Sequence, residues 1–393
     1  MSMFRTGNMT VSPIKLMELE AAKHPKVVSL AQGIPSFDTP DFLKNAAIEA
    51  IKSGKAAKYS LTNGLPELRE VVAESLRKDG MHYDYHSEII VTAGSIEAIT
   101  ASLLAILKPG DEVLIPSPVY ASYAQAIQLA HGTPVFVPLH EEGGWSVLVE
   151  EFEKRITPRT RVIFYCNPSN PTGTIFSKKD LLVLAEMAKK HDLFLLSDEV
   201  YKDFVYTGEE IFSLATIPEL KDRIIRVFSF SKAFAMTGWR VGFVHSSARN
   251  IAEILKAHDS MVTCAPVVSQ YAAIAAFSDE GNEAVQEFKA AYLRRLNMTT
   301  TFLNSLPDVF SYIKPNASYF VFPKIAPKNP QIIDSQQFCM ELLQKTGVAL
   351  VPGVAFGPTG EGHVRLSFGR SEPDLQEAFE RMHTFFRHFT ISS

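Results

Sequence analysis

The stretch Leu193-Phe-Leu-Leu-Ser197 is apolar on both faces and is followed directly by Asp198. A short run of this kind is typical of a strand that is buried on both sides of a parallel sheet. Six comparable runs occur at 88–92, 112–115, 134–137, 161–165, 224–229 and 241–244. Between them, residues 181–188 carry Leu and Ala at helical spacing, which indicates a helix that covers the sheet. The pattern predicts an α/β fold with a mostly parallel, seven-stranded sheet.

The pattern changes after about residue 280. A long helix is expected at 283–303, short strands at 319–323, 347–351 and 363–368, and a closing helix at 374–389. This mixture is typical of a smaller α+β domain. We therefore expect an N-terminal arm with part of the small domain at 1–44, a large domain at 45–280 and a small C-terminal domain at 281–393.

Composition and charge favour an enzyme that acts on small molecules. The net charge is −4 without long runs of like charge, so neither nucleic acid nor a membrane surface is an expected partner. Cys166, Cys264 and Cys339 show no CxxC spacing, which argues against a disulfide framework or a metal site and favours a reducing compartment. The N-terminal residues lack the apolar stretch of a signal peptide, and no segment approaches the ~18 apolar residues of a membrane span. We expect a cytoplasmic protein.

The segment Ser229-Phe-Ser-Lys-Ala-Phe-Ala-Met-Thr-Gly-Trp-Arg240 contains the most informative lysine. Lys232 follows an apolar strand and lies among small residues. Apolar surroundings disfavour the ammonium form of a lysine, and the neutral amine is the form that condenses with an aldehyde. Ser229, Ser231 and Arg240 are suited to a phosphate. An isolated lysine is far more often a plain surface residue, so this interpretation depends on the neighbouring residues.

This segment resembles the cofactor-lysine segment of the class I aminotransferases, fold-type I enzymes that use pyridoxal 5′-phosphate (PLP). Four further motifs match the family in order and spacing: Leu-Ala-Gln-Gly-Ile-Pro-Ser-Phe-Asp-Thr-Pro at 30–40, Asn-Pro-Ser-Asn-Pro-Thr-Gly at 167–173, Ser-Asp-Glu-Val-Tyr at 197–201, and Val-Arg-Leu-Ser-Phe at 364–368. The chain is similar to the subgroup of bacterial aspartate, aromatic and kynurenine-type aminotransferases. The resemblance implies that Lys232 holds PLP as a Schiff base and moves a proton from the α-carbon of the amino acid.

The resemblance also assigns four residues to the cofactor ring. Asp198 would pair with the pyridine nitrogen and keep it protonated, so that the ring accepts electrons from the α-carbon. Tyr201 and Asn170 would hydrogen-bond the phenolic oxygen, and Tyr120 would stack on the ring. From the residues alone, Asp198 is more often a helix N-cap, Asn170 an Asn-Pro turn and Tyr120 a core tyrosine.

An anion site is expected where residues 91–98 leave a strand and enter a helix. The backbone N–H groups of Ser95 and Ile96 would then lie at a helix N-terminus, which attracts anions. An ordinary serine N-cap explains the same pattern equally well. By resemblance, the cup for the cofactor phosphate consists of this helix end together with Ser229, Ser231 and Arg240.

Arg365 lies in an apolar strand candidate that would bury its stem. A buried guanidinium needs an anion that accepts two hydrogen bonds, and by resemblance this anion is the substrate α-carboxylate, with Gly33 leaving backbone close to it. A structural salt bridge is the competing interpretation. Tyr59 matches the tyrosine that reaches the phosphate of the neighbouring subunit's cofactor, which implies a homodimer with shared active sites.

Two other enzyme classes are alternatives to an aminotransferase. A nicotinamide dehydrogenase requires GxGxxG between a strand and a helix, whereas the one GxG, at 360–362, leads into a strand pattern. A PLP-dependent C–S β-lyase uses the same lysine, aspartate and arginine, so the motifs leave it open. Transfer of an amino group from an L-amino acid to a 2-oxo acid remains the preferred interpretation.

The substrate side chain is expected to be neutral. Aspartate-specific relatives of this subgroup carry a lysine where this chain has Ile96, and the stretch 258–277 contains neither Lys nor Arg. A dicarboxylate would then bury its second charge without a partner, at a cost of several kcal/mol, whereas an aromatic or aliphatic side chain gains from burial. We expect donors such as phenylalanine, tyrosine or methionine. A cation from the N-terminal residues would restore the alternative, an aspartate aminotransferase.

Overall fold

The computed structural model describes residues 13–208, 211–325 and 334–389 of the chain. The first twelve residues, which belong to the expected N-terminal arm and to the stretch searched for a signal peptide, lie outside the described residues, as do the last four of the expected C-terminal domain. None of the helices within the described ranges is long and apolar enough to cross a membrane.

A seven-stranded sheet forms the centre of the larger part of the molecule. Its strands run in the order β2-β8-β7-β6-β5-β3-β4. Their bounds are β2 Ile89–Thr92, β3 Glu112–Ser117, β4 Thr133–Pro138, β5 Thr160–Cys166, β6 Phe194–Asp198, β7 Ile224–Ser229 and β8 Gly242–His245. Only β8 is antiparallel to its neighbours. All seven predicted strands and the mostly parallel sheet are confirmed.

Helices pack against this sheet, and some do so through a single apolar stripe. α7 (Lys178–Lys190) begins with a capping box between Ser177 and Asp180 and buries Leu181, Leu184 and Ala188. This is the stripe expected from the sequence. The other helices of this part are α2 Asp41–Lys52, α3 Pro66–Lys78, α4 Ser95–Ile106, α5 Ser122–Leu129, α6 Val149–Glu153, α8 Phe230–Ala233, α9 Ala248–Val262 and α10 Val267–Ala275.

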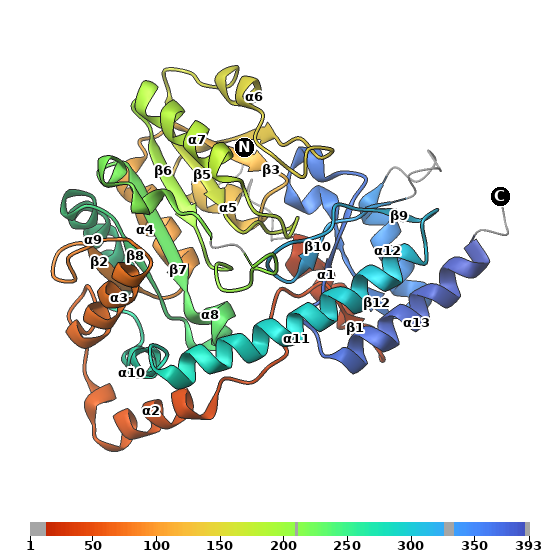
Figure 1. Ribbon diagram of the computed structural model, residues 1–393, viewed down its shortest axis with the longest axis horizontal. Coiled ribbons are helices and arrows are strands. Elements are labelled where there is room, and N and C mark those ends of the chain that lie inside the picture. Colours follow the sequence, from red (N-terminus) through yellow and green to blue (C-terminus); the bar gives the residue numbers. More distant parts are fainter. Residues whose placement is uncertain (1–12, 209–210, 326–333, 390–393) are drawn as a thin grey trace, which may run out of the picture.

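The C-terminal third forms a second part of mixed helices and short strands (Figure 1). The long helix α11 (Asp279–Asn304) extends from α10 towards α12 (Ser335–Thr346) and α13 (Glu372–Phe389). A three-stranded antiparallel sheet has the order β10-β14-β13, with bounds Phe320–Val321, Val364–Ser367 and Val351–Pro352. A smaller sheet pairs β9 (Phe310–Ser311) with β11 (Lys324–Ile325). The predicted helices and strands of this third are therefore present.

The N-terminal arm joins the C-terminal third. β1 (Val28–Ser29) pairs in parallel with β12 (Val348–Ala349), and α1 (Pro13–Ala21) packs against β12 and β13. This pairing places the N-terminal arm beside the C-terminal third, while the small domain expected from both segments stays a prediction. The boundaries at residues 44 and 280 stay a prediction.

The loops that carry the predicted site residues between 91 and 240 lie at one edge of the large sheet. β2, β3, β5, β6 and β7 are mutually parallel, so their carboxyl ends lie at the same edge. Because β8 runs the other way, its amino end lies there too. Ligands of open α/β sheets bind at this edge, and every motif singled out between residues 91 and 240 follows one of these strand ends or precedes β8.

Candidate active site

A cavity of about 490 Å³ opens at this edge of the sheet, between the large sheet and the C-terminal third. Its walls combine residues from the strand ends with residues from the N-terminal arm and from β14. The described residues that line it are Ile14, Lys15, Glu18, Gly33, Ile34, Ser95, Ile96, Tyr120, Ser122, Tyr123, Asn170, Asp198, Val200, Tyr201, Ser231, Lys232, Thr237, Arg240 and Arg365. Eleven of the thirteen site residues predicted from the sequence line this cavity, and the two that do not are Ser229 and Tyr59.

Lys232 lies on α8, a short helix that directly follows β7. Its partly buried Nζ donates a hydrogen bond to the Gly33 carbonyl oxygen at 2.7 Å. Burial lowers the pKa of Lys232 to about 8, helped by the positive charges of Arg365 and Arg240 and opposed by Asp198. A substantial fraction of this amine is therefore neutral near pH 8 and able to act as a nucleophile or a base.

Asp198 ends β6 and is buried beneath the cavity. Its Oδ2 accepts a hydrogen bond from the Tyr123 hydroxyl at 2.7 Å, and its Oδ1 accepts one from the Val200 backbone N–H at 3.1 Å. Burial raises the pKa of Asp198 to about 6, although both hydrogen bonds lower it. The chain forms turns after Asp198 and no α-helix begins there, so the helix N-cap alternative does not describe this residue.

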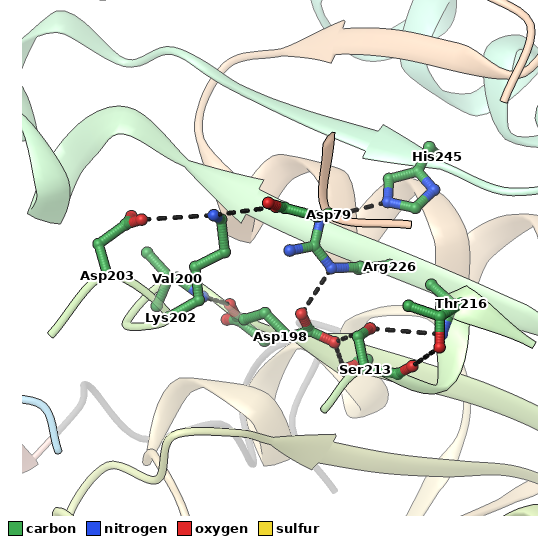
Figure 2. A network of polar contacts seen from close by, with 12 residues as sticks. Asp79, Asp198, Val200, Lys202, Asp203, Ser213, Thr216, Arg226 and His245 are labelled. Carbon is green, nitrogen blue, oxygen red and sulfur yellow. Dashed lines mark hydrogen bonds and ion pairs between the residues drawn. The ribbon is translucent and has the colours of Figure 1, made fainter. Parts of the chain in front are cut away.

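A buried ion pair supports the strand end that carries Asp198 (Figure 2). Arg226 Nε donates to Glu199 Oε2 at 2.6 Å, and both side chains are almost fully buried. The other oxygen of Glu199 accepts from Ser213 at 2.6 Å, while Arg226 Nη1 lies 3.2 Å from Nε2 of His245. Breaking a buried pair of this kind costs ~3–5 kcal/mol, so the pair holds the backbone next to Asp198 firmly in place.

Arg365, Asn170 and Tyr201 form a hydrogen-bonded group in the cavity wall. Asn170 Nδ2 donates to the Tyr201 hydroxyl oxygen at 3.4 Å, and Asn170 Oδ1 accepts from Arg365 Nη1 at 3.0 Å. Arg365 Nη2 donates to the Ala31 carbonyl oxygen. The sequence predicted these three residues for one site, and the structure brings them together.

The Arg365 guanidinium has no carboxylate partner in the part of the chain that the structure describes. Its Nε is buried without a hydrogen bond, and among the described residues no carboxylate forms an ion pair with it. Burial lowers the pKa of Arg365 to about 10, opposed by Tyr201, Tyr120, Tyr319 and Glu18. The structural salt bridge considered from the sequence is therefore not what surrounds Arg365, and the guanidinium is available for an anion that enters the cavity.

Arg240, from the loop before β8, lies against the first turn of α4. The N-cap of α4 is Gly94, whose backbone has φ +84°, so Ser95 is the first helical residue and not a serine cap. Arg240 Nη2 donates to the Ala93 carbonyl oxygen at 3.1 Å. A Cβ on Gly94 would lie 2.4 Å from this nitrogen, so glycine is what allows the guanidinium to approach the helix end.

The two serines of the lysine segment have different positions. Ser231 lines the cavity, whereas Ser229 lies behind it as the N-cap of α8 and accepts from the Ser231 backbone N–H at 3.2 Å. Ser229 also donates to Ser231 Oγ at 2.9 Å. Ser229 thus acts on the cavity by orienting Ser231.

The two remaining predicted tyrosines lie apart. Tyr120 lines the cavity, and its ring meets that of Tyr123 edge to face at 5.5 Å. Tyr59 is 82% exposed and does not line the cavity of its own chain. An aromatic side chain exposed to this extent is in the position expected if it serves another subunit, which stays a prediction.

Several cavity residues were not predicted from the sequence. Tyr123 contacts Asp198 directly, and its spacing of three from Tyr120 at a helix start was the available signal. Lys15 and Glu18 line the cavity as an ion pair, with 2.8 Å between Nζ and Oε2. The sequence left open a cation from the N-terminal residues, and Lys15 is such a cation in the cavity wall, where Glu18 is its ion-pair partner.

The α/β fold of this topology thus places a lysine of lowered pKa, a buried carboxylate and a buried arginine around one cavity. Residues 25–382 match the model of the family described as aminotransferase class I and II. The chain belongs to this family, and it is an aminotransferase of fold type I.

Characterised relatives agree with this assignment. The chain is 41% identical over 360 residues to aromatic-amino-acid aminotransferase 2 of Thermococcus litoralis, covering 91% of this chain and 90% of the relative. It is 41% identical over 377 residues to the aspartate aminotransferase of Pyrococcus abyssi, covering 95% of each chain. The crystal structure of an aromatic aminotransferase from Pyrococcus horikoshii OT3 superposes with a TM-score of 0.89 at 38% identity, covering 95% of this chain and 99% of that one.

Proposed function

We propose that this aminotransferase uses PLP held by Lys232 and transfers amino groups from neutral, preferably aromatic, L-amino acids to a 2-oxo acid. The observation that carries the proposal is the arrangement of three groups in one cavity: the Lys232 amine with its lowered pKa, the buried Asp198 and the unpaired guanidinium of Arg365. An amine, an acid and an anion site together match the needs of amino-acid chemistry at an aldehyde cofactor.

The residues of the cavity fit PLP. The α4 end with Ser95 and Ile96, together with Ser231 and Arg240, offers an anion cup to its phosphate. Asp198 suits the pyridine nitrogen, Asn170 and Tyr201 suit the phenolic oxygen, and Tyr120 suits the ring face. When bound, PLP supplies an aldehyde for amines and a ring that accepts electrons from the α-carbon.

The chain's own residues perform three tasks. Arg365 binds the substrate α-carboxylate through its N–H groups, with Gly33 leaving backbone close to it. Lys232 Nζ takes a proton from the α-carbon, for which a pKa of about 8 is well matched to neutral solution. Asp198 supplies negative charge at the bottom of the cavity, and the Tyr123 hydroxyl stabilises that charge.

The neighbouring subunit is part of this proposal. Tyr59 is too exposed to serve its own cavity, which supports a homodimer in which each Tyr59 reaches the phosphate of the other subunit. The cytoplasm is the proposed location, since Cys166, Cys264 and Cys339 are all free thiols.

The decisive experiment is a panel of amino donors with 2-oxoglutarate and PLP. The product to be measured is glutamate formed from each donor. We expect phenylalanine, tyrosine or methionine to exceed aspartate in kcat/KM, and the opposite order would replace our substrate assignment with an aspartate aminotransferase. Release of pyruvate and ammonia from cysteine-type substrates, without any amino transfer, would instead identify a C–S β-lyase.

A further inference from the structure

The ion pair between Lys15 and Glu18 lies in the wall of the cavity and has no role in the chemistry at Lys232. Both residues are on α1, which packs against β12 and β13, and they line the same cavity as Arg365. The Lys15 side chain is 64% exposed and the Glu18 side chain 18% exposed. Glu18 is also near enough to Arg365 to raise the pKa of its guanidinium. A charge pair therefore lies beside the binding site of the α-carboxylate.

The Lys15–Glu18 pair is suited to an enzyme that binds two chemically different substrates in one pocket. Under the proposed function, one pocket must hold the apolar side chain of the donor and then the second carboxylate of an acceptor such as 2-oxoglutarate. A fixed, unpaired cation would disfavour the apolar side chain, whereas a pocket without any cation would disfavour the dicarboxylate by several kcal/mol. The pocket therefore needs a cation that pairs with the second carboxylate of the acceptor and that is neutralised by another anion while the apolar side chain is bound.

We propose that Lys15 is the specificity-determining residue for dicarboxylate substrates. While an apolar side chain is bound, Glu18 remains the ion-pair partner of Lys15. The proposal rests on the proposed function and deepens it. The distal carboxylate of the substrate replaces the carboxylate of Glu18 on Lys15 Nζ, so one ion pair is exchanged for another. Lys15 therefore keeps a carboxylate partner in both states.

The energetics favour such an exchange. An ion pair three residues apart on a helix, with its lysine largely exposed, contributes only ~0.2–1 kcal/mol, so opening it costs little. The long stem of the lysine reorients freely, and the 18% exposed Glu18 side chain keeps partial contact with water. The apolar side chain, in turn, finds Ile14, Ile34 and Ile96 in the same wall. The same cavity thus offers both kinds of surface.

The test compares Lys15→Gln and Glu18→Gln with Lys23→Gln. Lys23 forms an equally close pair with Glu20, 2.6 Å apart, but does not line the cavity, so it is a matched control. For each variant of the PLP-loaded enzyme, we would measure kcat/KM for 2-oxoglutarate and phenylpyruvate, and the dissociation constants of maleate and 3-phenylpropionate by calorimetry. Neither of the last two compounds can be transaminated.

Lys15→Gln is expected to weaken maleate binding and lower kcat/KM for 2-oxoglutarate by about tenfold, with less than about twofold change for the aromatic compounds. Glu18→Gln is expected to tighten maleate binding relative to 3-phenylpropionate. Equal changes for both compound classes, or an effect of Lys23→Gln as large as that of Lys15→Gln, would overturn the proposal. If the wild type transferred no amino group, the proposed function would fail, while the two dissociation constants would still decide the role of the pair.

Discussion

Replacing Asp198 by asparagine is expected to stabilise the cofactor-free protein at neutral pH while removing most of the activity of the PLP-loaded enzyme. Burial raises the pKa of Asp198 from 3.8 to about 6. Each unit corresponds to ~1.36 kcal/mol, so the ionised carboxylate lowers the free energy of unfolding by about 3 kcal/mol at pH well above 6. Asparagine has a similar shape and avoids this cost, because its amide is neutral.

The sign of the pH dependence follows from the raised pKa. The folded protein binds the Asp198 proton more tightly than the unfolded chain, so this group's stabilisation is complete below pH 3.8 and is lost as the pH rises through 6. The gain of the variant over the wild type should therefore be about 3 kcal/mol at pH 8 and about half of that at pH 5.

Urea denaturation of the cofactor-free proteins at pH 5 and pH 8 measures this difference. Asp222→Asn, which changes an exposed aspartate, is the control and should show no comparable pH-dependent gain. A stability difference that does not change with pH would refute the raised pKa of Asp198.

With PLP bound, turnover of Asp198→Asn should fall by ~10²-fold or more, because a neutral amide cannot supply negative charge to the pyridine nitrogen. Near-normal turnover would refute this role of Asp198.

Three further predictions concern the cofactor and the substrate. Lys232→Ala should abolish the covalent PLP adduct that borohydride traps in the wild type, as measured by mass spectrometry, and a trapped adduct in the variant would contradict the assignment. For the wild type, the rate of covalent PLP uptake should rise with pH and level off above about 8, where the Lys232 amine is neutral, and a rise that continues to pH 10 would indicate an ordinary lysine. Gly94→Ala should weaken PLP binding in equilibrium titrations, because its Cβ would lie 2.4 Å from Arg240 Nη2, whereas Gly110→Ala, at φ +90° in open space, should leave PLP binding unchanged.

The large sheet could be predicted because most of its strands, unlike the edge strand β4, are buried on both faces. Runs such as 193–197 and 224–229 have no polar alternation, which separates them from strands with one exposed face. The order of the strands was not predictable in the same way, because it depends on which crossover connections pack best. The pairing of β1 with β12 was likewise beyond reach, since each strand has only two residues.

The site could be predicted where a residue follows a strand end or belongs to a motif. Asp198 and Lys232 satisfy both conditions, and the parallel strands bring their loops together. Tyr123 was missed because its position on α5 looks like that of any buried helix residue. Lys15 and Glu18 were missed because α1 reaches the cavity only through the packing of the two chain ends, which local sequence patterns do not record.

The pairing of β1 with β12 has a mechanical consequence. It joins α1 to the sheet region that carries Arg365, because α1 also packs against β13, which pairs with β14. Asp198 and Lys232 lie instead at the ends of β6 and β7 in the large sheet. Arg365 and the charge pair of α1 therefore share one structural support, so a shift of that support relative to the large sheet would move all three charges together.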